Sequence, residues 1–377
     1  MAVQKINIEQ FLQLSAEYTL LDVRSPGEYT HAHIPGALSL PLFTDEERKV
    51  VGTAYKQQSR EIAIKIGLDY FGIKMRGMVE QVENILTQKK SKKGNKDSVS
   101  HKTVLVHCWR GGMRSAGVAW LLDLYGFKVY TLGGGYKMYR QWARDQFEKN
   151  YDFNIIGGYT GTGKTLLLHE LKRLGNSVID LEALACHKGS AFGALGENPP
   201  PSQEMFENLL AVELSSITHP INNQDLNSLT EPKVIYIEDE SQRIGLLNIP
   251  STLWVSMRKS KVTFINIPFE ERLNYLTIEY GVFENEKLVN AIMRIQKRLG
   301  GLETKLAINF LLEKNHKECF RILLKYYDKY YEKGLHNRES LADLLTTISF
   351  DNIAIETIAK SIMDMKRSPD TNKKAQL

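Results

Sequence analysis

Twice in this chain a short apolar run leads directly into a glycine-rich loop and then into a segment with helical spacing. The first loop, H-C-W-R-G-G-M-R-S, spans His107–Ser115 and follows the run Val104–Val106. The second loop, G-Y-T-G-T-G-K-T, spans Gly158–Thr165 and follows Phe153–Ile156. A strand, a tight loop and a helix in that order are typical of parallel α/β sheets. We therefore expect an α/β fold in which both loops lie where a strand ends and a helix begins.

The other apolar runs divide into two groups on either side of residue 150. Strands are expected at 20–23, 104–107 and 129–132 in the first group, and at 153–156, 177–180, 234–237 and 262–267 in the second. A chain of 377 residues with 42% hydrophobic content can form two cores. We therefore predict one domain over residues 1–150 and a second over 151–377. The second domain should be mostly helical beyond Phe269 and should end in a flexible tail from about residue 366.

Composition excludes several classes of protein. No run approaches eighteen consecutive apolar residues, and the start, Met1–Lys5, lacks the regions of a secretion signal, so we expect a cytoplasmic protein without a membrane partner. Three cysteines are too few and too scattered for a disulfide scaffold or a zinc site. The net charge of +5 favours a polyanionic partner only weakly, because 49 basic residues almost balance 44 acidic ones.

The loop around Cys108 has the composition of a reactive thiol site. A thiol between a strand end and a helix start lies among unpaired N–H groups at the positive end of a helix dipole, and Arg110 and Arg114 favour its thiolate. Gly111 and Gly112 allow the turn to point several N–H groups toward a sulfur or selenium anion. We therefore interpret Cys108 as an exposed nucleophile or chalcogen carrier rather than a buried structural cysteine.

The second loop fits the phosphate-binding pattern G-x4-G-K-[ST] in full. Its residues are Gly158, Tyr159, Thr160, Gly161, Thr162, Gly163, Lys164 and Thr165. Backbone N–H groups of the loop would bind a diphosphate or nucleotide, Lys164 would supply a positive charge, and Thr165 would offer a ligand to Mg²⁺. Asp180, Asp239 and Glu240 end neighbouring strands and are candidate acidic partners of the loop. Each carboxylate could equally belong to a surface turn.

Three segments of the first domain resemble the rhodanese family. They are Leu21–Tyr29, His33–Ala37 and Leu132–Tyr136, and they stand in the family's order around the cysteine loop. The resemblance implies a persulfide or perselenide carried on Cys108. It implies that the anion is held by Trp109, Arg110, Gly111, Gly112, Met113 and Arg114. Cysteine-based phosphatases share the C-x5-R spacing and compete with this interpretation, but the upstream Asp22-Val23-Arg24 favours the rhodanese side.

The chain as a whole resembles the tRNA 2-selenouridine synthase family, from the N-terminus to roughly Lys333. The matching segments are Thr44–Arg48, Gly52–Gln58, Cys108–Ser115, Asp180–Ala185, His187–Gly193, Phe206–Leu210 and Glu238–Ser241. The implied fold is a rhodanese-like parallel-sheet domain followed by a P-loop NTPase-like α/β domain with C-terminal helices. One position departs from some relatives, because Ala54 stands where they have a second cysteine. A mechanism that needs a disulfide between that position and Cys108 is therefore in doubt.

The resemblance also implies an activity, namely exchange of sulfur for selenium at a 2-thiouridine in the wobble position of tRNA. Sulfur would first be alkylated by geranyl diphosphate, and selenophosphate would then supply the selenium. The loop Gly158–Thr165 would bind the prenyl diphosphate, and Cys108 would handle selenium. No tightly bound cofactor is expected; selenophosphate and geranyl diphosphate are the expected substrates, and Thr165 could hold Mg²⁺. The expected partner is the thiolated tRNA, and an enzyme that supplies selenophosphate could be a second one.

A basic helix face in the second domain is a candidate contact for tRNA or phosphate. Arg294, Lys297 and Arg298 recur at positions i, i+3 and i+4, and a solvated face explains that spacing as well. Two other functions stay open at this point. One is a rhodanese-type sulfurtransferase fused to an ATP-dependent kinase or ligase. The other is a nucleotide-gated sulfur carrier without catalytic turnover.

Overall fold

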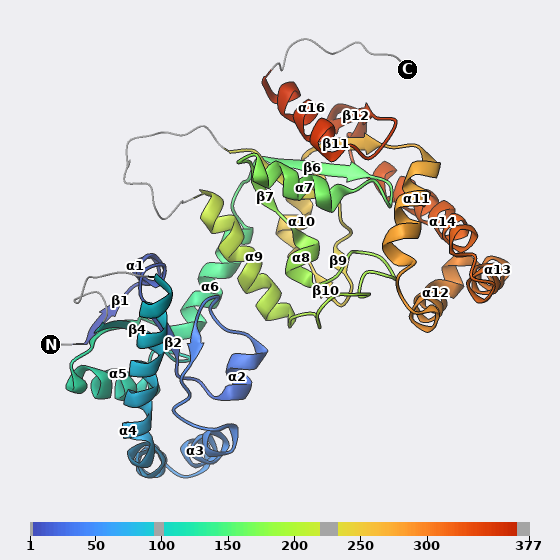
Figure 1. Ribbon diagram of the computed structural model, residues 1–377. Helices are drawn as coiled ribbons and strands as arrows, with labels where there is room; N and C mark the ends of the chain where they lie inside the picture. Colours follow the sequence, from blue (N-terminus) through green and yellow to red (C-terminus); the bar gives the residue numbers. More distant parts are fainter. Residues whose placement is uncertain (1–2, 94–101, 219–232, 368–377) are drawn as a thin grey trace. The chain divides into compact units, whose positions relative to one another are not determined.

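The computed structural model describes residues 3–93, 102–218 and 233–367 (Figure 1). The chain divides into two compact units. The first unit contains residues 1–146 together with 207–224, and the second contains residues 147–206 together with 225–377.

A parallel five-stranded sheet forms the centre of the first unit. Its strand order is β1 (Gln4–Ile6), β5 (Lys128–Leu132), β4 (Thr103–His107), β2 (Thr19–Asp22) and β3 (Leu38–Ser39). Every neighbouring pair in this sheet is parallel. The strands expected at 20–23, 104–107 and 129–132 are therefore confirmed, and β4, which leads to Cys108, lies in the middle of the sheet.

Local capping signals fix the helices of the first unit. These are α1 (Ile8–Ser15), α2 (Pro26–His31), α3 (Asp45–Gln57), α4 (Arg60–Lys93), α5 (Met113–Tyr125) and α6 (Gly135–Phe147). Thr44 and Glu47 form a capping box that starts α3, because each side chain bonds the other residue's backbone N–H. Gly126 ends α5 with a left-handed conformation at φ 103°, as its position after the helical run predicts.

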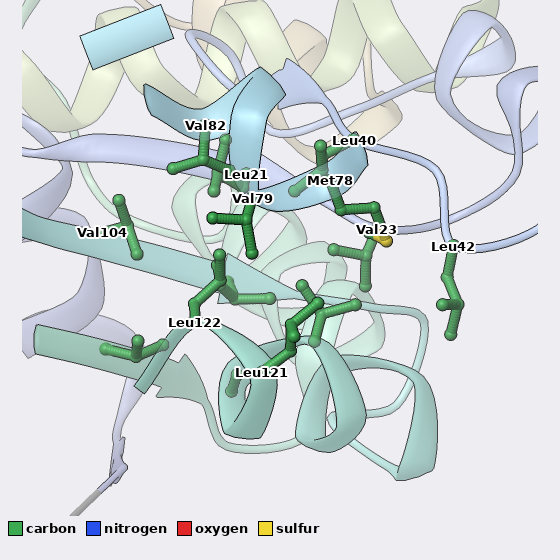
Figure 2. Packing of buried hydrophobic residues seen from close by; sticks show 14 of the residues in the cluster. Leu21, Val23, Leu40, Leu42, Met78, Val79, Val82, Val104, Leu121 and Leu122 are labelled. Carbon is green, nitrogen blue, oxygen red and sulfur yellow. The ribbon is translucent and has the colours of Figure 1, made fainter. Parts of the chain in front are cut away.

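One face of the first sheet is covered by α4 and α5. Figure 2 shows side chains of both helices gathered with those of the strands in one apolar cluster. The cluster includes Leu21, Val104, Met78, Val79, Val82, Leu121 and Leu122. Burial of this apolar surface stabilises the sheet and fixes the end of β4, from which the cysteine loop emerges.

The second unit is built on another parallel sheet. Its order is β12 (Leu345–Ser349), β11 (Lys261–Asn266), β6 (Phe153–Gly158), β8 (Ile235–Glu238) and β7 (Ser177–Ile179). The strands expected at 153–156, 177–180, 234–237 and 262–267 are confirmed. The strand β12 was not expected, because the sequence beyond Phe269 has helical spacing almost throughout. A short antiparallel pair, β9 (Arg243–Ile244) and β10 (Leu247–Asn248), follows β8.

Helices α7 and α16 pack on the second sheet, and α11 to α14 form a separate helical cluster. The helices after β6 are α7 (Lys164–Arg173), α8 (Leu181–Ala185), α9 (Gln203–Thr218), α10 (Ser251–Arg258), α11 (Phe269–Tyr280), α12 (Asn285–Leu299), α13 (Gly301–Leu312), α14 (His316–His336), α15 (Leu341–Leu344) and α16 (Ile355–Arg367). None of the helices in the described residues is long and apolar enough to cross a membrane. The predicted tail lies outside the described residues from 368 onward.

Candidate functional site

The thiol of Cys108 lies at the carboxyl end of β4, directly beneath the loop that leads into α5. Its Sγ is 3.2 Å from Oγ of Ser115, which in turn donates to the carbonyl of Gly112 at 3.1 Å. The expectation of an exposed thiol is wrong, because Cys108 is only 3% exposed. The loop above it is accessible, since Trp109 is 37% and Met113 51% exposed. A reactant would therefore reach the sulfur only when side chains of the loop move aside.

Close backbone packing holds the cysteine loop against the start of α6. The N–H of Tyr136 donates to the carbonyl of Cys108 at 2.8 Å. Gly135 has φ +62°, and a Cβ there would stand 2.3 Å from the Cys108 carbonyl oxygen and 2.4 Å from the nitrogen of Gly111. Only glycine permits this approach. Within the described parts of the chain, the backbone N–H of Gly111 donates no hydrogen bond to another backbone group.

The two arginines of the loop have different surroundings. Arg110 is exposed, whereas Arg114 donates from Nη1 to Oε2 of Glu28 at 2.7 Å. Burial would raise the pKa of Glu28, but the hydrogen bond and charge of Arg114, with the nearby Arg48, lower it below its ordinary value. Arg114 and Arg48 therefore share one carboxylate, whereas the exposed Arg110 offers its charge to solvent or to a bound anion.

A buried polar cluster supports the loop from below. The guanidinium of Arg24 pairs with Asp22 at 2.6 Å, donates to the carbonyl of Ala32 at 2.7 Å and lies 3.8 Å from the ring centre of Tyr136. His107 is fully buried, and burial lowers its pKa to about 4, so the ring is neutral at physiological pH. These residues explain the Asp22-Val23-Arg24 motif as a buried ion pair that fixes the segment beside the cysteine loop.

The phosphate-binding loop connects β6 to α7 and has the backbone conformation that its glycines permit. Gly158, Gly161 and Gly163 have φ values of 152°, 84° and 78°. A Cβ at Gly158 would stand 2.8 Å from Oγ1 of Thr162, so a larger residue would displace the turn. Nζ of Lys164 donates to the carbonyl of Gly158 at 2.9 Å, which keeps the cation over the loop.

The carboxylate next to Thr165 comes from α8. Oγ1 of Thr165 donates to Oε2 of Glu182 at 2.9 Å, and the N–H of Glu182 donates to Oε1 of Glu238 at 2.8 Å. Glu240 forms a side-chain hydrogen bond with Glu182. Burial raises the pKa of all three glutamates. Neighbouring carboxylates raise it further, since Asp180 repels the charge on Glu182 and on Glu238, and Glu182 repels the charge on Glu238 and on Glu240. Glu182 and Glu238 were not among the candidates, because the sequence does not show which carboxylates lie nearest the loop.

The other two candidate carboxylates have their own partners. Asp180 caps α8 by accepting from the N–H of Ala183 at 2.8 Å, and it pairs with His169 at 2.8 Å. Asp239 accepts from the hydroxyl of Tyr331 at 2.8 Å and forms an ion pair with Arg338. Of the three candidates, Glu240 alone contacts the carboxylate that binds Thr165.

Two residues of the helical cluster hold the phosphate loop in place. The hydroxyl of Tyr331, on α14, accepts from the N–H of Gly158 at 3.1 Å. Arg272, on α11, donates to the carbonyl of Thr160 at 3.1 Å and forms two 2.8 Å hydrogen bonds with Asp328. Sequence reasoning missed both contacts. The tyrosine spacing in α14 was visible in the sequence, but spacing does not identify which hydroxyl meets the loop.

The basic face of α12 is accessible. Arg294, Lys297 and Arg298 are all exposed, as their i, i+3, i+4 spacing requires when the opposite face is buried. Arg294 also lines a surface pocket of about 410 Å³ whose walls include Leu195 and Phe283. This face could therefore contact an anion or a nucleic acid without rearrangement of the helix.

The oxygen atoms around Thr165 suit a hard cation better than a transition metal. Among the residues that the structure describes, no group of three His, Cys, Asp or Glu side chains could hold a metal ion. The Thr165 hydroxyl and the Glu182 carboxylate are oxygen donors, which Mg²⁺ prefers. Phosphate oxygens of a bound substrate would have to complete the coordination shell.

Comparison with known proteins identifies relatives of both halves of the chain. The family described as "tRNA 2-selenouridine synthase AAA domain" matches residues 151–353, and the family "Rhodanese-like domain" matches residues 7–141. The chain is similar to proteins named tRNA 2-selenouridine synthase. The one from Nitrosomonas europaea is 36% identical over 269 residues, which are 70% of this chain and 64% of the relative. The one from Bdellovibrio bacteriovorus is 32% identical over 382 residues, covering 90% of this chain and 94% of the relative.

Proposed function

Because the chain belongs to the tRNA 2-selenouridine synthase family, we propose that it replaces sulfur by selenium at a 2-thiouridine in the wobble position of tRNA. The observation that carries this proposal is the presence, in one chain, of a rhodanese-type cysteine loop and a phosphate-binding loop backed by carboxylates. The first suits a heavy chalcogen, and the second suits a leaving diphosphate. We place the reaction in the cytoplasm, where tRNA is found.

The first stage is alkylation of the thiouridine sulfur by geranyl diphosphate. Sulfur attacks the allylic carbon, the carbon–oxygen bond breaks, and diphosphate leaves with the electron pair. We assign diphosphate binding to Gly158–Thr165. Lys164, held over the loop, would stabilise the charge that develops on the leaving oxygen. Thr165 and Glu182 would hold Mg²⁺, whose charge would add to that stabilisation.

The second stage is displacement of the S-geranyl group by selenium from selenophosphate. A carbon–selenium bond forms at C2, the carbon–sulfur bond breaks, and the geranyl thiolate leaves, while water takes up the phosphoryl group as phosphate. An alkylated sulfur is a far better leaving group than a thiocarbonyl sulfur, which explains the order of the stages. We propose that Cys108 takes part in this second stage, and that the loop from Trp109 to Arg114 holds the selenium-containing anion.

Binding of the tRNA is assigned to cationic side chains that need no rearrangement. Arg294, Lys297 and Arg298 form an exposed face that would pair with backbone phosphates. A separate enzyme would supply selenophosphate.

The test is incubation of the protein with 2-thiouridine tRNA, geranyl diphosphate and selenophosphate, followed by mass analysis of the nucleosides. We expect an S-geranylated nucleoside when selenophosphate is omitted and 2-selenouridine when it is present. Cys108→Ser should retain geranylation and lose selenation, and Lys164→Ala should lose both. Absence of both products from folded wild-type protein contradicts the proposal. ATP hydrolysis stimulated by a small acceptor would instead favour the sulfurtransferase–kinase alternative, and nucleotide binding without turnover would favour the carrier.

A further inference from the structure

Asn208 is fully buried in the first unit, although it lies more than fifty residues beyond the segment that forms that unit's sheet. It belongs to α9, and residues 207–218 of this helix pack in the first unit. Its Nδ2 donates to the carbonyl of His33 and to the hydroxyl of Tyr136, each at 2.8 Å. Its Oδ1 accepts from Nη1 of Arg140 at 2.5 Å. Every polar atom of this amide side chain therefore has a partner.

The hydroxyl that Asn208 contacts belongs to the residue that holds the cysteine loop. Tyr136 donates its backbone N–H to the carbonyl of Cys108 at 2.8 Å. Its buried ring lies under the guanidinium of Arg24 and has its centre 5.6 Å from that of Trp109. A shift of this ring would therefore move the loop carbonyl and the residue beside the thiol together.

The second contact of Asn208 is with the carbonyl of His33. His33 follows Ala32, whose carbonyl accepts from the Arg24 guanidinium. The amide of Asn208 thus connects the segment at His33 with the beginning of α6, which packs against the loop of Cys108. A buried amide with directed partners on both segments fixes their separation more sharply than apolar packing would.

We propose that Asn208 is a positioning residue for the Cys108 loop, acting through Tyr136 and His33. This inference rests on the function proposed above, because it assumes that Cys108 is a reacting thiol. Residues 1–146 then lack one component of their own site, and the α9 segment supplies it. The motif Phe206–Leu210, which the phosphate-binding chemistry does not explain, acquires a role in this way.

The experiment uses the full chain and two reactions of Cys108 that need no tRNA. In the first, the thiolate takes the outer sulfur of thiosulfate, releasing sulfite, and the persulfide passes that sulfur to cyanide as thiocyanate. In the second, iodoacetamide alkylates the thiolate and iodide leaves, and the rate is measured against pH. Asn208→Ala, Asn208→Asp and Tyr136→Phe are compared with Tyr139→Phe. The Tyr139 hydroxyl donates to the backbone carbonyl of Asn208 at 3.3 Å, so the control removes a similar bond without touching the amide.

We expect Asn208→Ala, Asn208→Asp and Tyr136→Phe each to lower kcat for sulfur transfer at least about tenfold, since each removes the hydrogen bond from Nδ2 of Asn208 to the Tyr136 hydroxyl. The pH profile of alkylation should shift in the same variants. The double variant, Asn208→Ala with Tyr136→Phe, should be no slower than the slower single variant. The hydrogen bond that Tyr136→Phe removes is already lost in Asn208→Ala. Tyr139→Phe should stay within about twofold of wild type. Diphosphate binding should be unchanged in all variants, since the phosphate loop lies in the other unit.

Several outcomes overturn the inference. One is a wild-type kcat with an unshifted pH profile in both Asn208→Ala and Tyr136→Phe. Another is a loss of kcat in Tyr139→Phe equal to that in the other variants, because the loss would then result from disturbed packing of the unit. Multiplying effects in the double variant would show that the two residues act independently. If Asn208→Ala does not fold, Tyr136→Phe decides, because it removes only a hydroxyl group. A wild-type Cys108 that reacts with neither reagent contradicts the proposed function as well.

Discussion

Replacement of Gly135 by alanine tests whether the backbone contact below the cysteine loop is essential. An alanine at φ +62° costs about 1–2 kcal/mol relative to glycine, because its Cβ crowds the following carbonyl. The new Cβ would also stand 2.3 Å from the Cys108 carbonyl and 2.4 Å from the Gly111 nitrogen, and both are backbone atoms that move only together with the loop. Repacking of that kind costs about 1–3 kcal/mol, so we expect the first unit to lose about 2–5 kcal/mol of stability.

The matched control is Gly112→Ala in the same loop. Gly112 has φ −101°, and a Cβ there meets no atom within 4 Å, so its loss of stability should stay below about 1 kcal/mol. Urea unfolding followed by tryptophan fluorescence measures both variants in a Trp254→Phe background, in which the remaining tryptophans belong to the first unit. Sulfur transfer from thiosulfate reports the loop itself. Equal stability and activity of the two variants would refute the close-approach argument.

Three further predictions concern single side chains. Tyr331→Phe removes the acceptor of the Gly158 N–H and should weaken diphosphate binding about three- to tenfold, as measured by calorimetry. The control Tyr330→Phe changes an exposed side chain and should leave the affinity unchanged. Equal affinities of the two variants would show that the Tyr331 hydroxyl does not support the loop. Glu28 has a lowered pKa, so it stabilises the fold above pH 4.5 and loses that contribution as the pH falls through its folded-state value. Acid unfolding of Glu28→Gln should therefore depend less steeply on pH below 4.5 than that of wild type, and parallel curves would refute the ion pair. Burial raises the pKa of Cys319 to about 12, so peptide mapping after iodoacetamide treatment at pH 8 should find it modified only in urea.

Much of the fold could be predicted because it depends on local signals. The apolar runs that form β2, β4, β5 and β6 are short and end in loop residues. Strands of a parallel sheet are buried on both faces, so a short continuous apolar run identifies them as strands. The predicted α/β class, with a rhodanese-like first half and a P-loop second half, is confirmed by the strand pairing and by the family matches. Gly126 ends α5 in a left-handed conformation, a C-cap that depends on a single residue and can therefore be read from the sequence.

The features that escaped prediction all depend on contacts between distant segments. The strand β12 is half exposed, and its pattern of burial gives no clear alternation. Residues 207–218 pack in the first unit with the help of buried hydrogen bonds made by Asn208, and the spacing of apolar residues in the sequence does not predict such bonds. Glu182 is the partner of Thr165 because α8 begins directly after β7, whereas Asp180, two residues earlier, caps the helix instead.

The order in which the second sheet is assembled has a consequence during synthesis on the ribosome. The phosphate-binding loop is translated early, but β12 and α16, which complete its sheet and cover α7, follow roughly 180 residues later. At about 5–20 residues per second, a nascent chain carries the loop without its edge strand for on the order of ten to forty seconds. For the last roughly 80 residues of that interval β11 has an open edge, and the chain is then most exposed to aggregation and to capture by chaperones.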